Sequence, residues 1–210
     1  GLSFGLTFLL VQVGQGSLFL LLVLTAIVSI VLGMGMPTTA IYLIVATLAA
    51  PPLRQLGIDP IAADMFVLYY GLLSMITPPV AIAAFTAANL AKAKPMQTAL
   101  LACRYGWPAF VLPFLFVLSP SLLLQGTALE VIQASVTAVA GVWLASAGLG
   151  GYFRGRLDLI GRVAMTIAGI GLLIPADAFG GAFWLEIGGI VLAIAIVSRQ
   201  FITHPTRTTA

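Results

Sequence analysis

The sequence predicts an all-α polytopic membrane protein in which two of the apolar segments are interrupted near their middles. Of its 210 residues, 61% are hydrophobic and only 7% are charged, a composition typical of polytopic membrane proteins. The interruptions are GMGMPTT at residues 33–39 and SMITPP at residues 74–79. In a bilayer, non-helical backbone is tolerated only where protein buries it or where it lines a wet cavity. Two such interruptions therefore predict a binding site, and transport is the function that they favour.

Residues 1–56 predict a helix end followed by a hairpin. Residues 2–11 are apolar, without a charged n-region or a cleavage site, so residues 1–16 are interpreted as the end of a truncated helix and a linker in the carboxy-terminal part of a longer protein. Residues 18–35 would cross about 27 Å as a helix, whereas residues 40–50 would cross only about 17 Å. A long arm, a tip at residues 37–39 and a shorter returning arm predict a re-entrant hairpin over residues 17–56.

Residues 61–92 predict one broken transmembrane helix. A continuous helix over residues 61–90 would be about 45 Å long, against a hydrocarbon core of about 30 Å. Pro79 has no amide N–H and disfavours helical geometry at Pro78. We expect the carbonyl groups of Ser74 and Met75, one turn earlier, to lose their helical partners and become available as cation ligands.

Four simpler apolar spans follow, at residues 105–124, 131–149, 159–174 and 183–197. They are assigned to a transmembrane helix of the core, residues 96–125, and to a three-helix membrane segment with a cytoplasmic tail, residues 126–210. If the spans alternate, Asp158 is the one acid on the basic side and Arg54 is the one base on the acidic side. The remaining basic residues are Lys92, Lys94, Arg104, Arg154, Arg156, Arg162, Arg199 and Arg207, and the remaining acids are Asp59, Asp64, Glu130, Asp177 and Glu186. The positive-inside rule makes the basic side and the C-terminus cytoplasmic, so the hairpin opens outward, toward the periplasm of a bacterium.

Oxygen ligands converge on the two interruptions. A sodium site needs several hard oxygens, which freed carbonyls and the hydroxyls of Thr38, Thr39 and Thr77 would supply, while the helix amino ends there would face an anionic substrate. Two alternatives remain open: a proline can simply kink a membrane helix, and a threonine hydroxyl can return to a carbonyl of the preceding turn.

The other polar residues and the methionines give less information about function. Asp64 is interpreted as a partner of the helix dipole rather than a proton carrier, Cys103 as a packing residue, and His204 as solvated. The methionines at 34, 36, 65 and 75 predict flexible packing, so no transition metal and no cofactor other than sodium is expected. Because protease motifs and paired deep carboxylates are lacking, no enzyme is predicted. The basic residues are topology signals, so no nucleic-acid partner is predicted.

Three motifs together carry a resemblance to a known family. LGMGMPTTA at residues 32–40, GIDP at 57–60 and GLLSMITPPVA at 71–81 resemble the large membrane component of tripartite ATP-independent periplasmic (TRAP) transporters, most closely the fused permease branch. The resemblance covers residues 1–125. It implies a sodium-driven secondary transporter of the ion-transporter-superfamily fold, with this chain as the second half of an inverted repeat. The helices after Gly126 resemble the additional carboxy-terminal segment of some fused permeases.

The family's site and partners follow from that resemblance. It implies elevator-type uptake of a small organic acid delivered by a periplasmic substrate-binding protein, with a small membrane component or its fused equivalent as a second partner and the lipid bilayer around both. Many relatives carry an acid where this chain has Pro37, so neutral oxygens would have to hold the ion. The sodium site would comprise Gly35, Met36, Thr38, Thr39, Ile76, Thr77, Pro78 and Val80, with Ser74 joining through its freed carbonyl.

Two other functions stay open from the sequence. In a passive channel the same interruptions would line a continuous pore. In a noncatalytic assembly subunit, glycines such as Gly141 and Gly148, or Gly188 and Gly189, would pack helices closely.

Overall fold

The computed structural model describes residues 2–14, 16–153, 155–175 and 180–203. All the regular elements in this part are helices, apart from an isolated bridge between Tyr152 and Arg156, as expected for an all-α protein. It divides into two compact units, Gly1–Val117 and Leu118–Ala210, and each is described by itself. Several positions used above for topology or the tail lie outside the described residues: Arg154, Asp177, His204, Arg207 and the side chain of Arg199.

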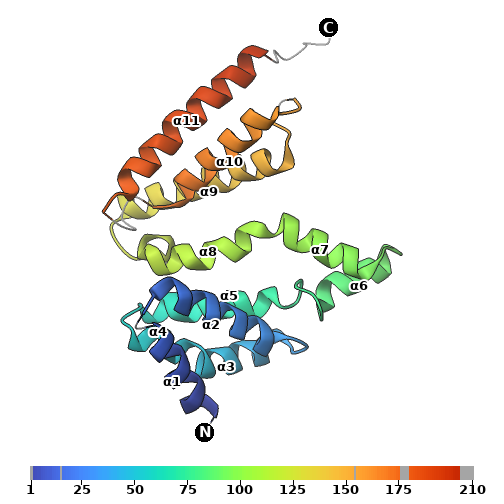
Figure 1. Ribbon diagram of the computed structural model, residues 1–210, viewed down its shortest axis with the longest axis vertical. Helices are drawn as coiled ribbons and strands as arrows, with labels where there is room; N and C mark the ends of the chain where they lie inside the picture. The colour runs from blue at the N-terminus through green and yellow to red at the C-terminus, as the bar shows by residue number, and fades with distance from the viewer. Residues whose placement is uncertain (1, 15, 154, 176–179, 204–210) are drawn as a thin grey trace. The chain divides into compact units, whose positions relative to one another are not determined.

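The first unit consists of short helices (Figure 1). They are α1 (Leu2–Gly14), α2 (Leu18–Gly33), α3 (Thr38–Leu48), α4 (Ala50–Gln55), α5 (Pro60–Leu73), α6 (Ile82–Leu90), α7 (Pro95–Tyr105) and α8 (Trp107–Leu118). Local chemistry sets two of the starts. Ser17 accepts from the Leu20 N–H before α2, and Asp59 accepts from the N–H groups of Ile61 and Ala62 before α5. The helix–turn–helix of α2 and α3 occupies the predicted hairpin, whose re-entrant course stays a prediction.

Aromatic side chains hold α5 against α8. Phe66 lies edge-on to Phe114 with ring centroids 5.4 Å apart, and Tyr70 lies 6.0 Å from the same ring. The Tyr70 hydroxyl also donates to the Phe110 carbonyl oxygen. On its other sides α5 packs against α2 and α3, which makes α5 the central helix of this unit.

The segment predicted as one transmembrane helix, residues 96–125 with its apolar span at 105–124, is bent in the structure, and its course through a membrane stays a prediction. Two helices, α7 and α8, meet at Gly106 with a bend of 42°, and α8 ends at Leu118. The bend has a local cause, because Pro108 has no N–H to continue the hydrogen-bond ladder and disfavours helical geometry at Trp107.

The second unit contains longer, uninterrupted helices. They are α9 (Ala128–Gly150), α10 (Leu159–Leu173) and α11 (Ala182–Thr203), preceded by a short 3₁₀ helix, η1 (Pro120–Leu123). Helix α10 packs against both α9 and α11, and η1 packs against α9. The second unit begins at Leu118 and so includes η1, while the boundary at residue 126 between membrane segments stays a prediction.

Glycines allow close approach between helices of the second unit. A Cβ at Gly141 would lie 2.8 Å from the Gly169 carbonyl oxygen, and one at Gly189 would lie 3.1 Å from that of Ala168. Gly148 is equally crowded, whereas Gly188 faces open space. Of the glycines singled out in the sequence, Gly141, Gly148 and Gly189 therefore pack helices and Gly188 does not.

The side chain of Arg162, on α10, caps the C-terminus of α9. Its guanidinium donates to the carbonyl oxygens of Gly148 and Leu149, at 3.4 and 3.2 Å. Gly151 follows with a φ of +73°, which favours glycine. The Arg162 charge thus meets the negative end of the α9 dipole.

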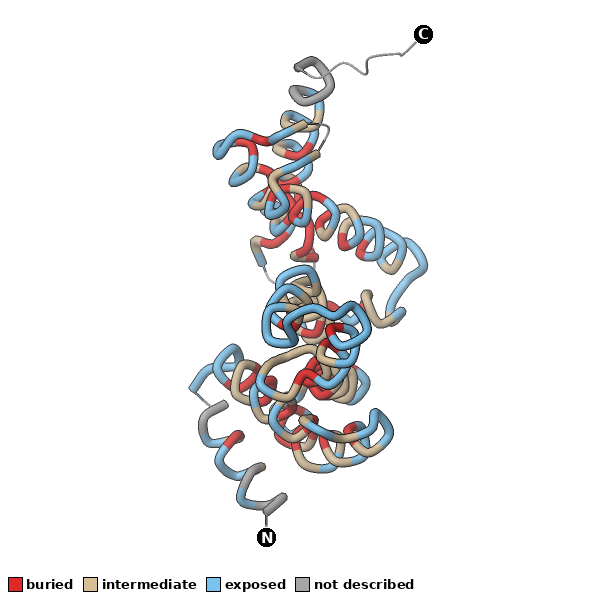
Figure 2. The backbone as a smooth tube through the Cα atoms, turned by 90° about the vertical axis from the view of Figure 1, so that its right-hand side faces the viewer, coloured by how far each residue is buried: buried red, intermediate tan, exposed pale blue. Residues whose placement is uncertain are grey.

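Buried and exposed positions alternate along the helices of both units (Figure 2). Many exposed side chains are large and apolar, among them Phe19, Leu43 and Leu90 in the first unit and Trp143 and Trp184 in the second. So much exposed apolar surface is typical of a protein covered by lipid. Among the described helices, α9 alone is long and apolar enough to cross a bilayer by itself, and α7 with α8 also qualifies as one bent span.

Candidate functional site

Helix α5 ends where Pro78 and Pro79 remove two amide donors. Its last turn tightens, because the N–H groups of Met75 and Ile76 donate three residues back, to Leu72 and Leu73. The chain then crosses residues 74–81 without regular structure before α6 begins at Ile82. Pro78–Pro79 is a cis peptide bond. The structure thus contains a helix interruption at the predicted position.

The two half-helices remain joined across the interruption. The Met75 carbonyl oxygen accepts from the Ala83 N–H at 3.0 Å, and the Thr77 carbonyl oxygen accepts from the Ala81 N–H at 3.2 Å. Ala81, which makes this turn, has a φ of +35° and is completely buried. The expectation that the Met75 carbonyl is left free is therefore wrong, because Ala83 replaces the missing proline donor.

Other carbonyl groups of the interruption do remain free. Among the described residues, no hydrogen bond ends on the carbonyl oxygens of Ser74, Pro78 or Val80. The Ile76 carbonyl oxygen accepts only a weak bond from the Cys103 thiol, at 3.4 Å. Three of the predicted site residues thus offer unpaired backbone oxygens at one place in the chain.

The hydroxyl groups near the interruption point back along α5. Ser74 Oγ donates to the Gly71 carbonyl oxygen at 2.6 Å, and Thr77 Oγ1 donates to the Leu73 carbonyl oxygen at 2.7 Å. This is the back-bonding that the sequence left open as an alternative. Each hydroxyl oxygen keeps lone pairs with which it can still accept or coordinate.

The tip between α2 and α3 presents backbone donors. Gly35 has a φ of +80° and Pro37 precedes α3 in extended geometry. No side chain caps α3, so the N–H groups of its first turn have no partner within the helix. Thr38 and Thr39 lie there with exposed side chains, while Met36 is half-buried against the core of the unit.

Glycines bring the end of α2 onto the end of α5. A Cβ at Gly33 would overlap the Gly71 carbonyl oxygen and lie 2.9 Å from Ser74 Oγ. A Cβ at Gly71 would lie 2.5 Å from Ile41 Cγ2 on α3. The base of the tip and the start of the interruption are thus in direct contact, whereas among the described residues no hydrogen bond joins the Thr38 or Thr39 side chain to the interruption.

The bend between α7 and α8 also meets the interruption. Cys103 reaches the Ile76 carbonyl, and the Ile76 side chain lies 3.4 Å from the position that a Cβ would take at Gly106. Cys103 thus contacts the interruption through its thiol, in addition to the packing role expected of it. The signal for the bend, Gly106 followed by Pro108, was present in the sequence.

The two acids of this unit have partners at other places: Asp59 caps α5, and Asp64 forms an ion pair. Asp64 pairs with Arg54 of α4, so it has a specific partner in place of the helix dipole. Among the described residues, no three acids, histidines or cysteines gather in a metal-binding group. A cation at the interruption would have to be held by neutral oxygens.

The exposed apolar surface is that of an all-α membrane protein. Within its apolar segments, the interrupted helix and the uncapped helix ends leave backbone polar groups unpaired. Residues 1–131 match the family described as Tripartite ATP-independent periplasmic transporter, DctM component. The chain belongs to this family. Comparison with curated proteins and with solved structures finds no significant match.

Family membership confirms the resemblance that the three motifs carried. The chain is a component of TRAP-type transport in the inner membrane, a system that also includes a periplasmic binding protein and a small membrane component. The match ends at residue 131, so most of α9 and all of α10 and α11 lie outside it.

Proposed function

We propose that this chain supplies one half of a sodium-coupled site for uptake of a small organic acid. The observation that carries the proposal is the set of free carbonyl oxygens at Ser74, Pro78 and Val80. Carbonyl oxygens without a formal charge suit a monovalent hard cation. The Ile76 carbonyl and the Thr77 hydroxyl would complete the ligands once the thiol of Cys103 withdraws.

The anionic substrate belongs at the helix amino ends. Neither α3 nor α6 has a side-chain cap, so both present backbone N–H groups and the positive end of a helix dipole. Sodium beside these ends would add attraction for a carboxylate. Binding of the ion and of the acid would then be mutually favourable, which is the requirement for coupled transport.

The mechanism proposed is of the elevator type. Sodium orders the tip at residues 34–39 against the interruption, and the loaded helices then move across the membrane against a fixed scaffold. A sodium ion entering down a potential of 100 mV contributes about 2.3 kcal/mol. The periplasmic binding protein delivers the acid, and a second hairpin and broken helix from the remainder of the permease complete the site.

Thermal stability against sodium concentration tests the ion site, with potassium at equal ionic strength as the comparison. A ligand that binds only the folded state raises the melting temperature in a saturable way. Thr77→Val and Thr38→Val should weaken that rise. Thr86→Val is the matched control for Thr77→Val, because Thr86 makes the same type of back-bond, to Ile82, at 2.8 Å. Thr47→Val on α3 is the control for Thr38→Val.

The outcomes separate the proposed function from its rivals. A sodium-specific rise that Thr77→Val abolishes and Thr86→Val preserves supports the site. No sodium effect contradicts coupling. Uptake into proteoliposomes that continues without a sodium gradient would instead indicate a channel, and transport that ignores both Thr38→Val and Thr77→Val would indicate an assembly subunit.

A further inference from the structure

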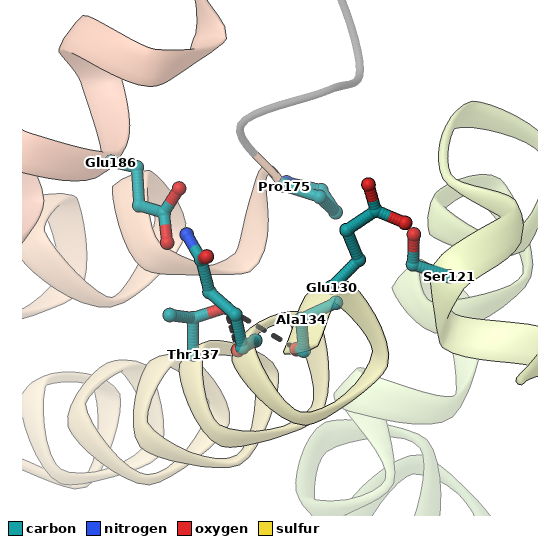
Figure 3. Close-up of a pocket in the computed structure, with 7 residues that line it drawn as sticks. Ser121, Glu130, Ala134, Thr137, Pro175 and Glu186 are labelled. Carbon is teal, nitrogen blue, oxygen red and sulfur yellow. Dashed lines mark hydrogen bonds between the residues drawn. The ribbon is translucent and has the colours of Figure 1, made fainter. Parts of the chain in front are cut away.

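The second unit contains a cavity of about 200 Å³. It lies between η1, the first turns of α9 and α11, and Pro175. Its lining includes Ser121, Glu130, Gln133, Thr137, Pro175 and Glu186. A water molecule occupies about 30 Å³ in the liquid, so the space exceeds that of a single water or a bare ion. Figure 3 shows Glu186 and Glu130 on opposite sides of this cavity.

Glu130 has a structural role that explains its presence. It forms a capping box with Thr127, in which a Glu130 carboxylate oxygen accepts from the Thr127 N–H at 2.9 Å and the Thr127 hydroxyl accepts from the Glu130 N–H. Such a pair satisfies the first donors of α9. The capping box therefore accounts for Glu130 but leaves its remaining lone pairs facing the cavity.

Glu186 has no comparable role. It is only 4% exposed, yet among the described residues no hydrogen bond or ion pair ends on its carboxylate. Figure 3 shows its carboxylate directed toward the cavity from α11. A side chain that is nearly buried and opens onto a cavity without a protein partner points to a ligand that the cavity receives.

The groups that line the cavity specify the charge of that ligand. The lining offers two carboxylates, an amide and hydroxyls, which are oxygen acceptors. The positive side chains described in this unit, Arg156 and Arg162, do not line the cavity. Arg162 instead contacts the far end of α9, at Gly148 and Leu149. A group that supplies positive charge must therefore come from outside the described residues.

We infer that this cavity binds a small cation that carries its own hydrogen-bond donors. An organic ammonium ion and a hydrated metal ion share that chemistry. Both would donate to Glu186 on one side and to Glu130 and the Thr137 hydroxyl on the other. No group of three acids, histidines or cysteines occurs among the described residues, so a directly ligated metal ion is disfavoured. The site is independent of the interruption in the first unit.

Thermal unfolding of the full chain tests this inference, in a buffer without sodium or potassium and at constant ionic strength, so that no other small cation competes for the cavity. Methylammonium, magnesium and calcium are titrated separately, with the bulky N-methylglucamine cation as a probe too large to enter. Glu186→Gln removes the charge but keeps the shape. Asp158→Asn is the matched control, because Asp158 is an acid of the same unit that caps α10 through Gly161, away from the cavity.

The expected result is a saturable rise in melting temperature with at least one small cation. Its apparent Kd should weaken about tenfold or more in Glu186→Gln, the factor for losing one charged hydrogen bond, and stay unchanged in Asp158→Asn. Ala134→Leu, which fills the cavity without altering charge, should abolish the rise. Methylammonium binding without the metals identifies an organic ammonium, and the reverse identifies a hydrated ion. Equal cation responses in the unmodified protein and Glu186→Gln would overturn the inference, as would a lack of response to every cation.

Discussion

The two units use helices in opposite ways. In the first unit the segment of α5 and α6 is divided, with helices of 14 and 9 residues on either side of the interruption. In the second unit α9 runs for 23 residues without a break. Both units bring backbones together through glycines, at Gly33 and Gly71 in one and at Gly141 and Gly169 in the other. Close packing is thus common to both units. They differ because the first unit loses helical backbone hydrogen bonds at the interruption, whereas α9 in the second unit is continuous.

That difference indicates a division of labour. A transmembrane helix that keeps every backbone bond offers a bound ion only side chains, whereas an interrupted one offers carbonyl oxygens and amide donors. The first unit exposes these groups between Ser74 and Ala81, and the second unit offers the carboxylates of Glu130 and Glu186 instead. Substitutions that treat the two units alike should therefore have different functional effects.

The largest effect is expected from added methyl groups at the glycine contacts. Gly33→Ala and Gly169→Ala each place a Cβ against backbone, so both should lower stability by about 3 kcal/mol, the upper range for overpacking. Only Gly33→Ala should also weaken the sodium-dependent rise in melting temperature. Gly188→Ala, which meets open space, serves as the control. Equal loss of the sodium response in both crowded variants would mean that the units do not differ in function.

A gain in stability is expected at two buried hydroxyl groups of the first unit. Thr25 and Ser29 on α2 are completely buried, and their side-chain oxygens have no hydrogen-bond partner. Replacing an unsatisfied buried hydroxyl by an apolar group of similar shape removes a desolvation cost of about 1–3 kcal/mol. Thr25→Val and Ser29→Ala should each raise the melting temperature. A decrease in both would show that a bound water or a further ligand satisfies these groups.

A smaller effect is expected at the ion pair between α4 and α5. Arg54 and Asp64 are partly exposed, with 42% and 22% of their side chains accessible, and such pairs contribute about 1 kcal/mol or less. Asp64→Asn should reduce stability by no more than this and leave the pH dependence of uptake unchanged. A lost or shifted pH profile would instead identify Asp64 as a proton carrier. The double variant with Arg54→Gln measures the coupling between the two charges.

The smallest effect is expected at Cys103, whose thiol donates a weak hydrogen bond to the Ile76 carbonyl oxygen. If that carbonyl coordinates sodium, the thiol competes with the ion. Cys103→Ala should then raise sodium affinity about twofold, the factor that corresponds to one weak S–H···O contact. Isothermal titration of both proteins with sodium measures this. A lower affinity in Cys103→Ala would show that the thiol supports the site.

Local chemistry explains what the sequence could predict. Pro37 and the Pro78–Pro79 pair remove donors wherever they stand, so the tip and the interruption could be located without knowledge of the fold. The same reasoning predicted free carbonyls at Ser74 but failed at Met75. The donor for Met75 comes from Ala83, on the far side of the interruption, and no local rule supplies that partner.

Features that depend on packing between distant segments were beyond the sequence. The contact of Cys103 with Ile76 spans 27 positions and requires the bend at Gly106. The acid-lined cavity requires α9 and α11 to be brought near each other, each packed against α10. In the sequence, Glu186 was visible only as a topology signal. Spacing within one helix could not have paired it with Glu130.

The hydrogen bond from Ala83 to Met75 has a mechanical consequence. Two half-helices without a hydrogen bond between them can rotate separately. The bond from Ala83 to Met75 instead links the motion of α6 to that of α5. Because this hydrogen bond joins backbone atoms, side-chain substitution does not remove it. A displacement of α6 is therefore expected to reach α5 through this bond, and to reach the tip through the close contacts at Gly71.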